Sequence, residues 1–264
     1  MSFARYAAAA LTTAVIATGA HAASLPADWV VDGNAGVAMP DGIMTAPPEQ
    51  GPGYYYVTTF EGKYGVGALP GVGGSGTPID GSTLTTSSFA AKAGDVLTFF
   101  FNYVTSDGAG YADYGWARLL NTAGDQAALL FTARTTPGGN SVPGFSMPDA
   151  QATLEPGVVD IIAGSPVWSV LGSESGTCYS VGCGYTGWVK STYEFLNDGD
   201  FNLQFGVTNW SDTNYASAMA FAGAQIAGVD ITPPTQPAPV PLPASAALLL
   251  AGMGALAATR RRKA

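Results

Sequence analysis

Short stretches of this 264-residue chain alternate between apolar residues and other residues, and Gly, Asp, Asn and Ser separate these stretches. Apolar side chains occupy every second position from 201 to 207 and again from 97 to 103. A period of two is typical of a β-strand that buries one face. From such runs and the turn residues between them, we expect strands at residues 54–60, 84–90, 96–104, 114–120, 127–133, 158–162, 188–195, 201–208, 216–221 and 225–231.

Helix signals are rare between residues 23 and 231, whereas the 35 Gly and 18 Pro residues of the chain mark frequent turns. Many short strands joined by turns predict an all-β fold, an antiparallel β-sandwich of jelly-roll type. Within it, residues 65–78 (GVGALPGVGGSGTP) are expected to form a flexible loop or lid. Their Gly-x-Gly-x-x-Gly pattern has the letters of a dinucleotide-binding fingerprint, but Pro78 follows and no helix begins there.

The first 22 residues have the pattern of a secretory signal peptide. Arg5 precedes an apolar run from residue 7 to 20, and Ala20 and Ala22 provide a small-x-small cleavage site. We expect cleavage after Ala22 and export of the remaining chain. An uncleaved anchor is the alternative, but the run is short and rich in alanine.

The last 25 residues combine three features in a fixed order. A Pro-containing motif comes first, an apolar stretch from 244 to 258 follows, and basic residues end the chain. Apolar residues leave water for hydrocarbon, and the cationic block stays on the cytoplasmic side. A permanent span needs ~20 residues, so this hydrophobic helix suits a transient stop. The motif consists of Val240, Pro241, Leu242, Pro243 and Ala244, and the basic block of Arg260, Arg261, Arg262 and Lys263.

This tail resembles the PEP-CTERM class of sorting signals in its VPLPA form. The resemblance implies that exosortase, a membrane protease, recognises the Pro motif and releases the protein or transfers it to the cell surface. An ordinary tail anchor is the alternative. Residues 84–231 also resemble exported proteins with such tails, through segments such as SGTCYSVGCGYTGWVKSTY. We therefore divide the chain into a signal peptide at 1–22, a β-sandwich domain at 23–231, a Pro-rich linker at 232–239 and a sorting tail at 240–264.

The exported segment is strongly acidic. It holds all 19 Asp and Glu residues but only five of the 10 Lys and Arg residues, which gives it a net charge of −14. Such a surface repels nucleic acid and anionic polymers and attracts cations such as calcium. Solubility in a salty medium explains the same charge without a ligand.

The only histidine, His21, lies in the signal peptide, so the exported segment has none. This excludes Ser-His-Asp and Cys-His catalysis there, and also every His-ligated metal site. The two cysteines of the chain, Cys178 and Cys183, would meet an oxidising compartment. We expect them to form a disulfide that closes a small loop.

Residues 102–120 (NYVTSDGAGYADYGWARLL) concentrate the side chains that could bind a ligand. Tyr111, Tyr114 and Trp116 could stack on sugar rings, and Trp210 and Tyr215 lie in a similar loop. Asp107 and Asp113 could share a calcium ion, because hard cations prefer carboxylate oxygens on such turns. The alternative is that the two Asp residues only shape a turn and the aromatic residues fill the core.

These patterns indicate a non-catalytic structural or binding protein of the cell surface or extracellular matrix, with a polysaccharide as the candidate partner and no nucleic acid. The chain is expected outside the cell or at its surface, after transient anchoring in the inner membrane. The alternative is a secreted polysaccharide hydrolase that uses two carboxylates. Its glutamates are scattered and no nucleophile elbow occurs, so the sequence indicates no enzyme.

Overall fold

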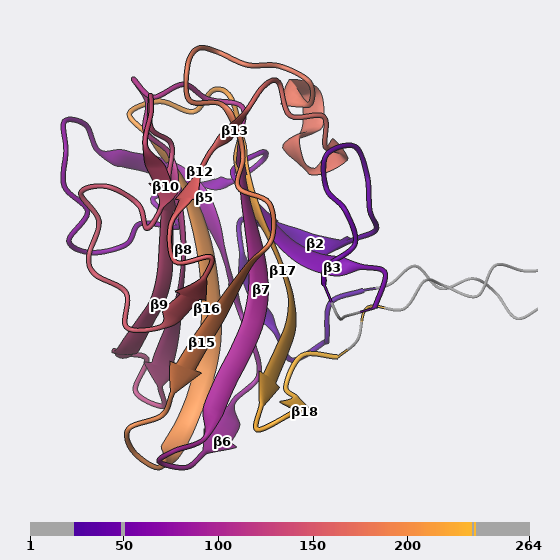
Figure 1. Ribbon diagram of the computed structural model, residues 1–264, viewed down its shortest axis with the longest axis vertical. Coiled ribbons are helices and arrows are strands. Elements are labelled where there is room, and N and C mark those ends of the chain that lie inside the picture. Colours follow the sequence, from indigo (N-terminus) through magenta and orange to yellow (C-terminus); the bar gives the residue numbers. More distant parts are fainter. Residues whose placement is uncertain (1–23, 49–50, 234, 236–264) are drawn as a thin grey trace, which may run out of the picture. The chain divides into compact units, whose positions relative to one another are not determined.

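Two antiparallel sheets face each other in the computed structural model, which describes residues 24–48, 51–233 and 235 (Figure 1). The expectations for the signal peptide and the sorting tail concern residues that lie outside these ranges. Its strands are β1 (Val30–Asp32), β2 (Asn34–Ala38), β3 (Tyr54–Thr58), β4 (Lys63–Tyr64), β5 (Pro78–Thr85), β6 (Phe89–Ala91), β7 (Val96–Thr105), β8 (Tyr114–Asn121), β9 (Gln126–Arg134), β10 (Asn140–Val142), β11 (Thr153–Glu155), β12 (Val159–Asp160), β13 (Ile162–Ala163), β14 (Gly184–Tyr185), β15 (Val189–Glu194), β16 (Gly199–Trp210), β17 (Ser217–Ile226) and β18 (Val229–Asp230), and its one described helix is the 3₁₀ helix η1 (Ser169–Glu174).

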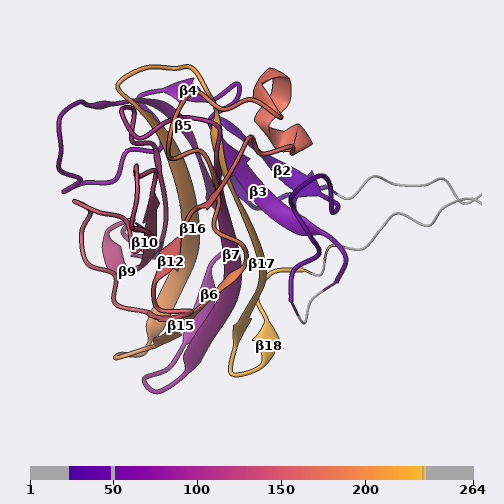
Figure 2. The same cartoon turned by 45° about the horizontal axis from the view of Figure 1, so that its top comes forward.

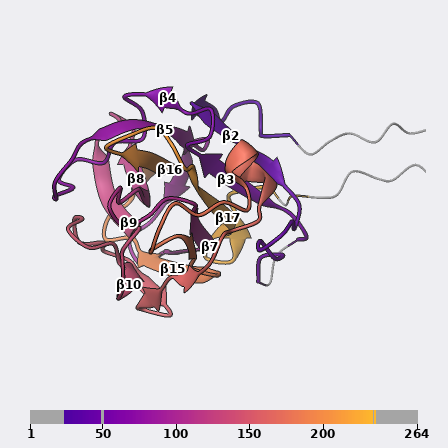
Figure 3. The ribbon, with the colours of Figure 1, turned by 90° about the horizontal axis from the view of Figure 1, so that it is seen from above.

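Eight of these strands have the order of a jelly roll. One sheet contains β5-β16-β8-β9 and the other contains β15-β7-β17-β3, and neighbouring strands in each are antiparallel. Seen from above, the two sets of strands form separate layers (Figure 3). The chain crosses from one layer to the other between β3, β5, β7 and β8, and again between β9, β15, β16 and β17. The predicted jelly-roll sandwich is therefore confirmed.

The alternating patterns place their apolar residues between the sheets. On β7, Phe99 and Phe101 are at most 1% exposed, and on β16, Phe205 is fully buried. The Phe101 ring stacks on Phe131 of β9, with 3.6 Å between ring centroids. Each such side chain contributes about 1.5–3 kcal/mol by leaving water.

Two further apolar clusters lie on the outer faces of the sheets. Alternate alanines of β17, such as Ala218 and Ala220, point outward, and their small size leaves room for Trp168 beside η1. The Trp168 indole N–H donates to the Tyr54 hydroxyl at 3.0 Å. On the other sheet, the Gly-rich residues 65–77 and residues 143–150 cover an aromatic cluster.

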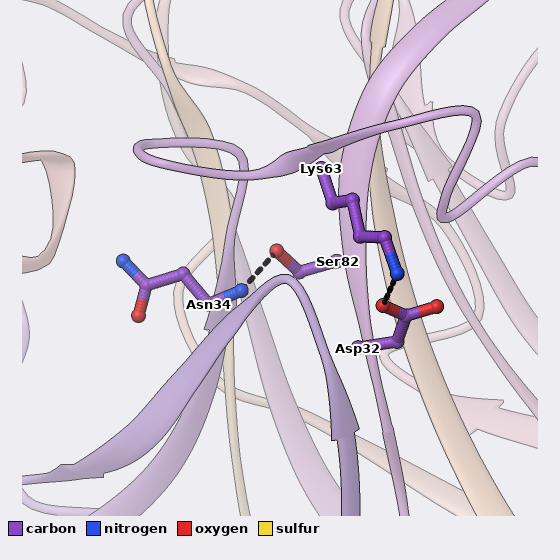
Figure 4. A network of polar contacts seen from close by, with 4 residues as sticks. All are labelled: Asp32, Asn34, Lys63 and Ser82. Carbon is purple, nitrogen blue, oxygen red and sulfur yellow. Dashed lines mark hydrogen bonds and ion pairs between the residues drawn. The ribbon is translucent and has the colours of Figure 1, made fainter.

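The chain passes from one sheet to the other at Gly33, between β1 and β2. Its φ of +93° lies in the left-handed region, and an added Cβ would lie 2.6 Å from a backbone carbonyl oxygen of β5. Glycine meets both constraints because it has no Cβ. Figure 4 shows the surrounding contacts: the Asn34 backbone N–H donates to the Ser82 hydroxyl at 2.7 Å, and Lys63 pairs with Asp32 at 2.8 Å.

The structure differs from the expected strands at several places. Residues 158–162 form no single strand, because β12 pairs with β10 and β13 pairs with β14. Residues 84–90 form no single strand, because β5 ends at Thr85 and β6 begins at Phe89. Residues 225–231 belong to the end of β17 and to β18, joined by a turn. The short strands β1, β2, β4, β10, β11 and β14 were not predicted. The residues of β1 and β2 show no alternation in burial. Beyond residue 231, the chain still contacts the domain through Pro233, whose carbonyl accepts from the Tyr55 hydroxyl at 2.7 Å.

Within the described ranges, no helix combines the length and the apolar character that a membrane span requires.

Candidate functional site

The long connections of the jelly roll gather at one end of the sandwich, which we call the loop end. They comprise residues 59–77, 106–113 and 211–216 and parts of the connection 135–188, whereas the opposite end has the shorter turns at 86–95, 122–125 and 195–198. In Figures 1 and 2 the loop end is at the top, beside η1, and the turn between β17 and β18 is at the bottom. Binding residues concentrate on loops that a rigid scaffold positions, so the loop end is the candidate site.

Three of these loops bring together three tyrosines, which we call the tyrosine platform: Tyr111, Tyr179 and Tyr215. The ring centroids of Tyr111 and Tyr179 are 5.5 Å apart, and those of Tyr179 and Tyr215 are 5.0 Å apart. Tyr179 is 48% exposed, and the other two rings are half-buried. The rings therefore form a continuous aromatic surface that water reaches.

Backbone contacts hold the platform in place. The Tyr179 N–H donates to the Ser106 carbonyl at 3.0 Å, and the Ala109 N–H donates to the Val181 carbonyl at 2.9 Å. The Cys178–Cys183 disulfide closes the loop that carries Tyr179, as the sequence predicted. These contacts join the loop to the end of β7 and limit the movement of the Tyr179 ring.

The loop that carries Tyr215 has an unusual backbone. Tyr215 has a φ of +58° and Ser211 has a φ of +79°, so two residues with side chains adopt the left-handed conformation within five positions. Such conformations cost free energy and cluster at binding and catalytic sites. The Glu174 carboxylate accepts a hydrogen bond from the Ala216 N–H and helps to fix this loop.

The carboxylate of Asp113, two residues after Tyr111, is fully buried. One of its oxygens accepts from the Trp210 N–H and the other from the Ser217 hydroxyl, both at 2.7 Å. Burial raises the pKa of Asp113 well above its usual range. This side chain joins the start of β8 to the end of β16 and the start of β17.

Asp107 is also fully buried, but it is only partly satisfied. Its Oδ1 accepts from the Gly108 N–H at 2.6 Å, and its Oδ2 has no hydrogen-bond partner among the described residues. Burial, together with the nearby charges of Asp212 and Glu174, raises the pKa of Asp107 to about 7. A buried carboxyl without partners costs less free energy when it is protonated.

Calcium binding by Asp107 and Asp113 stays a prediction. Both oxygens of Asp113 already accept protein hydrogen bonds. Across residues 24–48, 51–233 and 235, no three His, Cys, Asp or Glu side chains form a group that could hold a metal ion.

Of the three aromatic residues expected to form a ligand surface, only Tyr111 faces solvent. Tyr114 is fully buried and Trp116 is 1% exposed, because the Gly-rich residues 65–77 cover them. The Trp116 indole N–H donates to the Gly67 carbonyl at 2.8 Å, and the Leu69 N–H donates to the Tyr114 hydroxyl at 3.2 Å. These two residues therefore stabilise the fold, and the expectation that they present a face to a ligand needs correction.

The platform contains two residues that the expected ligand surface omitted. Tyr215 lies in the loop that the sequence indicated as similar, but Tyr179 carried no signal beyond its place beside Cys178. Trp210, which precedes the Tyr215 loop, is only 4% exposed and packs in the same cluster as Tyr114 and Trp116. Its neighbour Asn209 is also buried, at 1% exposed, and its side-chain amide donates to Asp80 at 3.1 Å.

A groove outside the tyrosine platform is relevant to the alternative that the protein is a polysaccharide hydrolase. It has a volume of about 440 Å³ and lies beside β9, between residues 143–150 and 152–157. Asp149 is the one carboxylate among its described lining residues, which include Thr132, Met147 and Leu154. Carboxylate catalysis of glycoside hydrolysis requires two acids across one cleft.

Comparison with a family model identifies the C-terminal tail. Residues 239–263 match the PEP-CTERM protein-sorting motif, so the chain ends in a PEP-CTERM sorting tail, as the sequence predicted. A search of curated proteins finds no match to this chain.

Several solved structures are similar in part. A cleaved adhesin domain of Lys-gingipain from Porphyromonas gingivalis is 15% identical, over 76% of this chain and 93% of that one, with a TM-score of 0.35. TmCBM61, solved in complex with beta-1,4-galactotriose, is 9% identical over 74% of this chain and 86% of that one, with a TM-score of 0.31. The active domain of bacteriophage CBA120 tailspike protein 4 is 8% identical over 75% of this chain and 20% of that one, with a TM-score of 0.32. Likenesses this weak do not indicate a ligand.

Proposed function

We propose that the β-sandwich is a non-catalytic, saccharide-binding module of an exported protein, and that the tyrosine platform is its binding surface. The observation that carries this proposal is the meeting of Tyr111, Tyr179 and Tyr215 from three separate loops at one end of the jelly roll. A water-accessible aromatic surface of this kind needs an explanation, because apolar rings are more often buried.

The chemistry of tyrosine suits a saccharide ligand. Each ring offers a flat apolar face for the C–H groups of a sugar, and each hydroxyl can bond a sugar hydroxyl. Because the disulfide and backbone hydrogen bonds already hold the loops, binding would immobilise few additional groups. Such preorganisation raises affinity.

The sorting tail provides the setting for this function. We propose that an exosortase-type protease recognises the Pro motif, and that the sandwich then acts at the cell surface or in the extracellular matrix. A polysaccharide of that matrix is the proposed partner. The −14 charge of residues 23–243 disfavours nucleic acid as a ligand.

Substitution of the most exposed platform ring tests the proposal. Tyr179→Ala is expected to weaken binding to a polysaccharide that the parent protein binds by at least about fivefold, since one aromatic contact contributes roughly 1 kcal/mol beyond its buried area. Tyr64→Ala is the matched control, because Tyr64 is 81% exposed and lies in none of the aromatic pairs of the described residues. Affinity electrophoresis against a polysaccharide panel, with melting temperatures for each variant, provides the measurement.

Two results would overturn the proposal. If both variants bind like the parent, the platform is not the binding surface. If the parent releases reducing ends from a polysaccharide, the module is a hydrolase and the non-catalytic assignment fails.

A further inference from the structure

The three rings of the tyrosine platform are tilted relative to one another. The ring planes of Tyr111 and Tyr179 meet at 75°, and those of Tyr179 and Tyr215 meet at 47°. Two rings can stack on the same flat surface only if their own planes are nearly parallel. The platform is therefore bent, and no flat object can lie face to face with Tyr179 and either of its neighbours at once.

The backbone fixes this bend. Buried Ser106 joins two of the three loops: its carbonyl accepts from the Tyr179 N–H at 3.0 Å, and its own N–H and hydroxyl donate to the Ala216 carbonyl at 3.1 Å and 2.8 Å. In the third loop, the Tyr111 N–H donates to the Gly108 carbonyl at 2.9 Å. Moving the loops to bring the rings into one plane would break these hydrogen bonds, so the bend belongs to the fold.

The spacing of the rings suits successive sugar units. Neighbouring ring centroids are 5.5 Å and 5.0 Å apart, which is close to the length of one pyranose unit in an extended chain. One sugar can therefore lie against each ring if the chain turns between units as the rings do. Rotation about the glycosidic bonds allows this turn in a separated chain, whereas lattice packing holds the chains of a crystalline polysaccharide flat.

We infer that the tyrosine platform binds a single, separated polysaccharide chain, with one sugar unit against each ring, in preference to the flat face of a crystalline polysaccharide. This inference rests on the proposed function, because it names the ligand class of the same surface. A separated chain follows the bend and contacts Tyr111, Tyr179 and Tyr215 together. A flat crystal face loses the contact with at least one ring.

Two physical forms of the same polymers test the inference. The purified protein is offered cellulose and chitin, each as a crystalline and as a swollen, disordered preparation, together with the panel of soluble polysaccharides. The part of the binding that Tyr179→Ala removes measures the platform. For the best-bound swollen or soluble polymer, that part should be at least about fivefold tighter than for either crystalline form, since one lost aromatic contact corresponds to roughly this factor. Tyr64→Ala, the exposed control, should change neither.

Oligomers of that best-bound polymer provide a second measurement. Titration calorimetry should show the affinity increasing about fivefold with each added sugar until the oligomer covers the three rings, and changing little in longer oligomers. A surface that requires a crystal face would bind none of these oligomers.

Each other outcome has one meaning. Adsorption to crystalline cellulose or chitin that is as tight as the binding of separated chains, and that Tyr179→Ala removes, overturns the inference and leaves the proposed function intact. Affinity that is already complete with a monosaccharide also overturns the inference, because a single ring would then hold the ligand. If Tyr179→Ala alters the binding of no polysaccharide in either form, the inference fails together with the proposed function.

Discussion

Replacing Asp107 with Asn should change how the stability of this protein depends on pH. The carboxyl group is fully buried, its Oδ2 lacks a partner among the described residues, and its pKa is raised from 3.8 to about 7. The folded protein therefore holds this proton more tightly than the unfolded chain does. The contribution of Asp107 to the free energy of unfolding is fully present below pH 3.8, and it is lost as the pH rises through about 7.

The size of the loss follows from the two pKa values. A difference of one between folded and unfolded pKa corresponds to 1.36 kcal/mol, so Asp107 costs up to about 4 kcal/mol of unfolding free energy at pH 8. The pKa of Asp113 is raised too, and that carboxyl adds a loss of the same sign. An amide cannot ionise, so Asp107→Asn removes the first loss and leaves the second.

Urea denaturation at several pH values between 4 and 8 measures the effect. The free energy of unfolding of the parent should fall more than that of Asp107→Asn over this range. The stability of the variant relative to the parent should therefore increase as the pH rises. Asp125→Asn, an exposed change at the opposite end, should follow the parent. If the parent and Asp107→Asn lose stability in parallel, Asp107 is ionised in the fold and the reasoning is refuted.

Calcium would neutralise the same carboxylate in another way. If Asp107 and Asp113 hold calcium, millimolar calcium should raise the melting temperature of the parent at pH 8, because a bound ion stabilises the native state by mass action. Asp107→Asn should abolish that rise. An unchanged melting temperature in the parent would exclude this calcium site.

Three further predictions concern the framework and the tail. Gly33→Ala should destabilise the fold by about 2 kcal/mol or more in urea denaturation, because Ala at a φ of +93° is strained and its Cβ would meet the β5 backbone; an unchanged midpoint would contradict this. Replacing Cys178 and Cys183 with Ser should cost about 2 kcal/mol by the loop-entropy estimate and should weaken ligand binding through Tyr179, and a variant of parental stability would show that the disulfide adds nothing. Replacing Pro241 and Pro243 with Ala should prevent correct sorting, which cell fractionation measures, and normal processing of the variant would argue against a role for the Pro motif.

Much of the architecture could be predicted from the sequence. The alternation on β7 and β16 identified the inward faces, because a strand that buries one face must place an apolar residue at every second position. The short strands β1 and β2 could not be predicted, since they lie at sheet edges and their side chains are only partly covered.

The candidate site was predictable only in part. Tyr111 and the disulfide followed from the residue pattern, whereas Tyr114 and Trp116 were assigned to the wrong environment. Alternation distinguishes the two faces of a strand, but it does not reveal that a distant Gly-rich segment covers the outer face. That segment lies nearly 50 positions before Trp116, and Gly67 reaches the indole only in the folded protein.

The sequence alone therefore determined the class of fold, the disulfide and the sorting tail, because each depends on residues that are close together in the chain. Only the tertiary structure decided which aromatic rings face water and which carboxylates are buried. The tyrosine platform combines residues up to 104 positions apart, from Tyr111 to Tyr215, and the jelly-roll crossings bring their loops to one end. Burial, and with it the raised pKa of Asp107, depends on that assembly and not on any local pattern.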